Sequence, residues 1–346
     1  MYSEDEITAA VDAGVMDEKT ARAFRGFVEQ RRNGALADEE HFRFLTGFGD
    51  IFVTVGILLL LIPAIWLGTD FLGNPFGFAV GAAVSWLLAE QFTRRRRQAL
   101  PSIVLLVGFV LCVFLSGFFL AAESFFAGRS IDLTEVEDAS SLLFFLPGLV
   151  GAGAAYLHWW RFRVPITVAA GALCLGYTVL FLLGAIFPAA WHYSEWIIFA
   201  FGVFTFGLAM LWDSRDTARS TRQSDVAFWL HLCAAPMLVH PVFMSLIQGD
   251  VTAVEILAVM AIYGMTILLA LIIDRRAMLV SAAAYVLYAL SETIGAKSAV
   301  PELKYILASL VLGALLLTFS VFWQQARRVL VAPLPEDIKR RLPSVG

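Results

Sequence analysis

Residues 48–67 read FGDIFVTVGILLLLIPAIWL, and this stretch decides the fold class. An α-helix rises about 1.5 Å per residue, so roughly 20 apolar residues cross the hydrocarbon core of a bilayer. The stretch follows a charged segment of 47 residues, whereas a cleavable secretory signal has a short basic start. We therefore expect a permanent membrane helix at this position.

The composition of the whole chain agrees with a membrane protein. Of 346 residues, 59% are hydrophobic and 16% are charged, whereas soluble domains carry about 25% charged residues. The mean hydropathy is +0.77. The net charge of −4 is small and gives no argument for a nucleic-acid partner. Cys112, Cys174 and Cys233 lie in apolar runs without metal-ligand spacing, so we interpret them as packing residues.

Ten apolar stretches of membrane-spanning length follow one another from residue 48 onward. They predict an all-α, polytopic transmembrane helix bundle of about ten spans, in which short connections make successive helices neighbours. The predicted spans are 48–67, 73–92, 99–121, 141–159, 164–186, 194–212, 226–247, 251–273, 277–294 and 304–323. The chain then divides into a cytoplasmic helical segment (1–47), the bundle (48–323) and a basic cytoplasmic tail (324–346).

The Lys and Arg residues predict the orientation of the bundle, because cytoplasmic connections keep an excess of them. With the N-terminus inside, 22 of the 25 basic residues fall on the inner side, and Arg129, Lys297 and Lys304 fall outside. If one span were removed from the prediction, the connections after it would change sides and the basic residues would no longer be concentrated on the inner side. We therefore expect a multi-pass protein of the bacterial inner membrane with both termini in the cytoplasm.

The segment 1–47 carries the signals of two short helices. Ser3 with Glu6 forms a capping-box pattern, and Gly14 suits a helix end. The apolar faces of two such helices are too small for an independent core. We interpret the segment as an interaction or regulatory module that membrane insertion does not require.

Charged residues mark the inner end of the second span. Glu90 and Arg94 are four residues apart, so they share a helix face and can pair. The run Arg94, Arg95, Arg96 and Arg97 can attract anionic lipid headgroups. The same run is explained equally well as a signal that keeps this connection in the cytoplasm.

Five ionisable residues are predicted toward the outer half of the membrane, where a buried charge is costly unless it is paired or hydrated. They are His192, Glu195, His240, Glu255 and Glu292, and we take them as a candidate polar centre. The tight turn after the seventh span predicts that the seventh and eighth spans lie side by side. His240 and Glu255 are then within about one helical turn of each other in depth, so we expect them to form a hydrogen-bonded pair.

The sequence contains no motif for a chemical reaction, such as a nucleophile–base arrangement, a phosphate-binding glycine loop or HExxH. His231 and His240 are about half a helical turn out of phase. This disfavours a shared metal ion and favours a structural hydrogen bond for His231. We therefore expect no catalytic residue, no cofactor and no metal ion.

The stretch 38–68, DEEHFRFLTGFGDIFVTVGILLLLIPAIWLG, resembles bacterial membrane proteins of the domain-of-unknown-function family numbered 2157. The helical stretch AAVDAGVMDEKTARAF (9–24) and the ending QARRVLVAPLPEDIKRRLPSV (325–345) resemble the same group. The resemblance implies a multi-helix membrane region and brings no established activity or functional residue.

Three functions stay open at this point. The first interpretation is a non-catalytic inner-membrane protein with a cytoplasmic interaction segment. The second is a secondary permease or proton-coupled carrier, whose polar centre would be the outer-half His and Glu residues. The third is a membrane-embedded enzyme that acts on lipid-linked substrates through those same groups.

Overall fold

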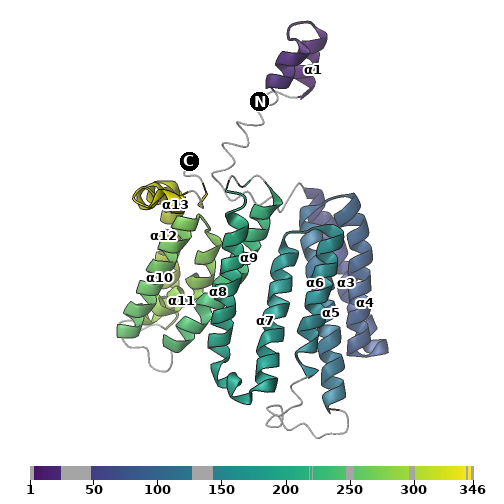
Figure 1. Ribbon diagram of the computed structural model, residues 1–346, viewed down its shortest axis with the longest axis vertical. Helices are drawn as coiled ribbons and strands as arrows, with labels where there is room; N and C mark the ends of the chain where they lie inside the picture. The colour runs from purple at the N-terminus through teal and green to yellow at the C-terminus, as the bar shows by residue number, and fades with distance from the viewer. Residues whose placement is uncertain are drawn as a thin grey trace.

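The computed structural model describes residues 4–24, 48–126, 143–217, 219, 221–246, 253–295, 301–339 and 342–343. Within these ranges every regular element is a helix, which confirms the predicted all-α class (Figure 1). The predicted loop 122–140 is described only as far as residue 126, and Ser3 of the expected capping box lies outside the described residues.

Each of the ten predicted spans coincides with one helix. The helices are α3 (Phe48–Leu72), α4 (Asn74–Ala89), α5 (Ala99–Phe126), α6 (Leu146–Phe162), α7 (Ile166–Ile186), α8 (Ser194–Asp213), α9 (Arg222–Leu246), α10 (Ala253–Ile273), α11 (Ala277–Gly295) and α12 (Pro301–Val331). Shorter elements are α1 (Glu4–Asp12), a helix at 18–24, the π-turn η1 (Glu90–Arg95), the 3₁₀ turn η4 (Pro188–Tyr193) and α13 (Glu336–Lys339). Local hydropathy therefore locates the helices correctly.

Among the described residues, seven helices are long and apolar enough to cross a membrane. They are α3, α5, α7, α8, α9, α10 and α12. Two of the other three are shorter, since α4 has 16 residues and α6 has 17. The chain is therefore a multi-pass membrane protein, and this measure gives seven spans where the sequence predicts ten.

The helices run nearly parallel to one another and form two groups (Figure 1). One group comprises α3 to α6, and the other comprises α8 to α12. Helix α7 joins them, because Ala169 and Ala172 of α7 share a buried cluster with Ala209 of α8 and Leu230 of α9. The α4–α5, α6–α7 and α8–α9 connections lie at one end of the bundle (Figure 1), which we call the arginine-rich end.

Close packing of α3 against α4 depends on small residues. A Cβ atom at Gly77 would lie 2.2 Å from the backbone nitrogen of Thr69, and one at Gly81 would lie 2.5 Å from Ile65. Both glycines are buried. A small-residue face lets two membrane helices approach closely, so this face of α4 is used for packing inside the bundle.

The C-terminal part of the chain is packed against the bundle. Helix α12 continues to Val331, eight residues beyond the predicted end of the last span at 323. Leu342 belongs to a buried cluster with Trp323, and the Arg327 guanidinium donates a hydrogen bond of 2.6 Å to the Pro343 carbonyl. The predicted tail thus begins inside a helix and returns to the core.

Candidate functional site: an arginine-lined pocket

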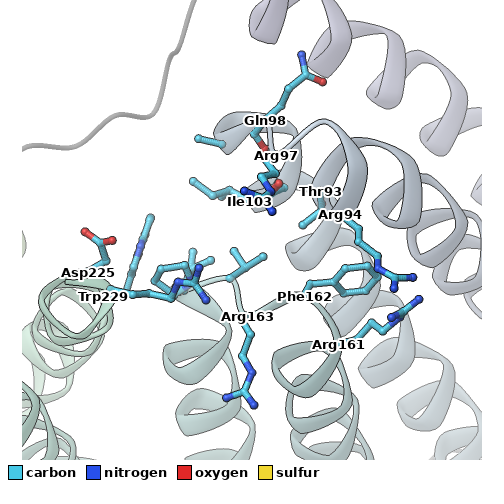
Figure 2. Close-up of a pocket in the computed structure, with 16 residues that line it drawn as sticks. Thr93, Arg94, Arg97, Gln98, Ile103, Arg161, Phe162, Arg163, Asp225 and Trp229 are labelled. Atoms are coloured by element: carbon cyan, nitrogen blue, oxygen red, sulfur yellow. The ribbon is translucent and has the colours of Figure 1, made fainter. Parts of the chain in front are cut away.

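A pocket of about 690 Å³ lies at the arginine-rich end. Residues of the α4–α5 connection, the α6–α7 connection and the first turns of α9 line it. Figure 2 shows Arg94 and Arg161 on one side, with Asp225 and Trp229 of α9 on the other. The pocket therefore lies where the two groups of helices meet, and we call it the arginine pocket.

Five arginines line the arginine pocket, against Asp225 as the one carboxylate in its lining. The five are Arg94, Arg97, Arg161, Arg163 and Arg222. Glu90 accepts hydrogen bonds of 2.7 and 3.0 Å from Arg161 and one of 3.2 Å from Arg94. This confirms the predicted Glu90–Arg94 pair and adds Arg161 of α6. Because two carboxylates offset two of the five arginines, an excess of three positive charges remains.

Two arginines of the arginine pocket are available to a ligand. Within the described residues, neither Arg97 nor Arg222 donates a hydrogen bond to a protein group. Arg163 lies over the Trp159 ring, with 5.6 Å between its guanidinium carbon and the ring centroid. Of the predicted run of four arginines, Arg94 and Arg97 line the pocket, whereas the Arg96 guanidinium carbon lies 5.6 Å from the Phe92 ring centroid.

Thr93 adds a hydrogen-bond donor to the arginine pocket. Its side chain lines the pocket, the residue is only 7% exposed, and its hydroxyl has no hydrogen-bond partner among the described residues. Buried hydroxyls are normally hydrogen-bonded. An unpartnered buried donor beside five arginines therefore indicates a place for an anionic ligand group.

The backbone around the arginine pocket departs from regular helix. Thr93 lies in the π-turn η1, and single π-turns inside helices occur frequently at functional sites. Arg97 and Arg163 have φ of +53° and +57°, in the left-handed region that favours glycine. Such residues cost of order 1–3 kcal/mol each. Arginines at two such positions indicate that their side chains are needed there.

A second group of charges at this end is buried and paired. We call it the ionic cluster: Asp213, Arg219, His231, Asp274, Arg275 and Arg327. Asp213 pairs with Arg275, whose Nε donates at 3.2 Å, and with His231 Nε2 at 2.9 Å. Asp274 accepts from Arg219 at 2.9 Å and from the Trp323 indole at 2.7 Å. The cluster joins the ends of α8 to α12, and the hydrogen bond predicted for His231 is confirmed.

The ionic cluster was not predicted from the sequence. Residues 213–225 fall between two predicted spans, and Arg275 and Arg276 were counted only among the basic residues of the inner side. The signal available was the occurrence of Asp directly at the ends of two apolar runs, at Asp213 and Asp274. A carboxylate at such a boundary needs a basic partner when it is buried.

The structure places the five residues of the candidate polar centre on separate elements. His192 is exposed in η4, Glu195 and Glu255 lie in the first turns of α8 and α10, and Glu292 accepts a 2.6 Å hydrogen bond from Lys304 of α12. His240 Nδ1 is hydrogen-bonded to the Tyr285 hydroxyl of α11.

Tyr285 was not singled out from the sequence, and helix packing explains why. Helix α9 packs more extensively against α11 than against α10, although residues of all three helices share one buried cluster. The predicted contact of α9 with α10 is therefore present, and the larger contact of α9 with α11 was not foreseen from the sequence. The pairing of His240 with Glu255 stays a prediction.

Among the described residues, no group of three or more His, Cys, Asp and Glu side chains is arranged to hold a metal ion. Cys112, Cys174 and Cys233 are buried free thiols. The guanidinium and hydroxyl donors that line the arginine pocket are suited to the recognition of negative charge.

The helices and their lengths define a multi-pass membrane protein. Comparison with protein-family models, with curated proteins and with solved structures finds no match, so the resemblance to family 2157 gains no support.

Proposed function

We propose that this chain is a multi-pass protein of the bacterial inner membrane, with ten spans and cytoplasmic termini, that binds anionic lipid headgroups in the arginine pocket. The observation that carries the proposal is the excess of three positive charges around the unpartnered Thr93 hydroxyl. Arginine and hydroxyl donors together are the groups that proteins use to hold phosphate oxygens. The function is binding without catalysis.

Three contacts at the arginine-rich end support ten spans over seven. In each case, the chain between the two contacting residues forms two helices. One of them is among the seven that are long and apolar enough to cross a membrane, and the other is not. Gln98 after α4 donates a 3.0 Å hydrogen bond to Asp50 at the start of α3. Arg161 of α6 binds Glu90 before α5, and Trp323 of α12 binds Asp274 before α11. If α3, α5 and α12 each cross the membrane, these contacts require α4, α6 and α11 to return, and this supports ten spans.

A membrane lipid suits the position and lining of the arginine pocket. The pocket is lined by residues at the ends of helices long enough to cross a membrane, where a bilayer would meet water. Phe162 and Trp229 line it together with the arginines, so an acyl or glycerol portion would find apolar contacts. Basic residues at the cytoplasmic surface attract anionic lipids by about 1 kcal/mol each.

The segment 1–47 is proposed to be an interaction or regulatory module. Gly14 ends its first helix with φ of +71°, as the sequence predicts, and the second helix begins after Asp17, whose carboxylate accepts a hydrogen bond from the Thr20 amide. The described helices carry more acidic than basic residues, so they would bind a basic surface.

A carrier is the second candidate. The supporting observation is that His240 of α9 is hydrogen-bonded to Tyr285 of α11. Proline residues at 236 and 241 flank His240 within α9. Proline removes a helical hydrogen bond, which leaves backbone groups that can bind water or a substrate.

Binding to nanodiscs that contain phosphatidylglycerol tests the proposed function. We expect the double variant Arg97→Gln/Arg222→Gln to reduce the number of retained phosphatidylglycerol molecules, measured by native mass spectrometry, with an affinity loss of at least about tenfold. The matched control is Arg95→Gln/Arg96→Gln, which removes two charges from the same end but outside the pocket lining. Equal losses in both double variants would show general surface attraction and contradict the proposal.

A further inference from the structure

The available donors of the arginine pocket come from both groups of helices. Thr93 belongs to η1, Arg97 belongs to the connection after η1, and Arg222 begins α9. A ligand that satisfies all of them must present acceptor oxygens in several directions. The charge excess of three also requires more than one negative charge for compensation.

From this arrangement we infer that the ligand of the arginine pocket bears a terminal phosphate, as a phosphate monoester or a diphosphate; this rests on the function proposed above. A phosphodiester headgroup carries one negative charge and two non-bridging oxygens. A terminal phosphate carries about two charges at neutral pH and three strong acceptor oxygens. The phosphodiester leaves two of the three excess positive charges uncompensated, whereas a phosphate monoester leaves one and a diphosphate leaves none.

The donor types match a terminal phosphate in geometry as well as in charge. A guanidinium group donates two parallel hydrogen bonds to two oxygens of one phosphate. Arg97 and Arg222, from opposite groups of helices, would each occupy one such edge, and the Thr93 hydroxyl would donate to a remaining oxygen. The left-handed backbone at Arg97 places an arginine where a glycine would cost less, which agrees with a specific task for this side chain.

The volume of the arginine pocket indicates that the phosphate is part of a larger molecule. Pockets for organic ligands range over about 300–1,000 Å³, and the arginine pocket has about 690 Å³. Ile103 and Phe162 supply apolar walls. The volume therefore accommodates a second phosphate or a glycerol group next to the terminal phosphate.

The test compares two lipids with the same acyl chains in nanodiscs of phosphatidylcholine. Phosphatidic acid carries a phosphate monoester, and phosphatidylglycerol carries a phosphodiester. At pH 7.5 we expect the full-length chain to bind phosphatidic acid about tenfold more tightly, measured by native mass spectrometry. Thr93→Val and Arg97→Gln should each remove most of this preference, while Arg95→Gln keeps it.

A change of pH provides a second readout. The second proton of a phosphate monoester binds with a pKa near 6, so the preference for phosphatidic acid should disappear at about pH 5. Glu90 and Asp225 are the carboxylates that face the arginines. Unchanged binding of phosphatidylglycerol over the same pH range would show that these two carboxylates do not cause the effect.

Measurements with soluble compounds test whether the phosphate belongs to a lipid or to a soluble ligand. Glycerol 3-phosphate and inorganic pyrophosphate are added to the chain in phosphatidylcholine nanodiscs, and the unfolding temperature is measured. Stabilisation by either compound that Arg97→Gln removes supports a terminal phosphate from a soluble ligand. If both lipids bound equally tightly and the pocket variants weakened the binding of both, the inference of a terminal phosphate would be contradicted. The proposed binding of anionic lipid would stand. If neither Thr93→Val nor Arg97→Gln weakened lipid binding, the proposed function would be contradicted as well.

Discussion

At the residue scale, four charged residues in the described part of the chain have positive φ angles, and all four lie at the arginine pocket or in the ionic cluster. They are Arg97, Arg163, Arg219 and Asp274, with φ between +52° and +57°. Each ends or follows a helix at a connection, where a glycine is the usual residue. Each of these side chains contacts an opposite charge or an aromatic ring, or lines the arginine pocket. These interactions offset the conformational cost of the positive φ angle.

Arg97 allows the backbone contribution to be separated from that of the side chain. Arg97→Gly and Arg97→Ala both remove the guanidinium, but only glycine adopts a positive φ without strain. We expect the glycine variant to be more stable than the alanine variant by about 1 kcal/mol in denaturant unfolding. Both should bind anionic lipid equally weakly. Equal stability of the two variants would show that Arg97 is not held in the left-handed region.

At the scale of the elements, buried ion pairs hold the helix ends of the second group together. Asp213 ends α8, His231 lies on α9, and Arg275 precedes α11, yet the three side chains meet with exposures of 3% or less. Transfer of a charge out of water is costly, so loss of one partner leaves the other uncompensated. The ionic cluster therefore fixes the relative positions of these helices.

Arg275→Met tests the role of the ionic cluster. We expect it to reduce the free energy of unfolding in detergent by about 3–5 kcal/mol, because Asp213 remains buried without its main partner. Lys339→Met is the control, since Lys339 pairs with the exposed Glu336, and exposed pairs contribute about 0–1 kcal/mol. If Arg275→Met changed stability no more than Lys339→Met, Asp213 would not depend on this pair.

At the scale of the whole molecule, contacts at one end of the bundle relate the helices to the membrane. The arginine pocket joins connections on three different pairs of helices, so an even number of crossings must separate them. The same end holds the ionic cluster and the end of α12. The gathering of basic side chains at one end agrees with the orientation that their distribution along the sequence predicts.

Cysteine labelling in intact cells tests this topology. Substitutions at Ser130 and Ser298 should react with a membrane-impermeant thiol reagent, and one at Ser220 should not, because only the first two are predicted outside. The natural cysteines are buried, so the unsubstituted chain should give a low background. Reaction at Ser220 alone would reverse the orientation, and protection of both Ser130 and Ser220 would contradict the predicted number of spans.

Much of the fold follows from the sequence because membrane helices are local structures. In a bilayer each helix satisfies its own backbone hydrogen bonds, so about 20 apolar residues suffice to define one. This is why ten predicted ranges coincide with ten helices, and why the Glu90–Arg94 pair, four residues apart on one helix, could be predicted.

Contacts between helices were decided only by the tertiary structure. Arg97, Arg163 and Arg222 are more than 50 residues apart from one another, and nothing in the local pattern places them around one pocket. In the same way, His240 meets Tyr285 because α9 packs more extensively against α11 than against α10. Helix packing depends on the shapes of side chains across the whole bundle. The sequence by itself determined a bundle of membrane helices with its basic residues in alternate connections, and only the packing of those helices placed several of these residues around one pocket.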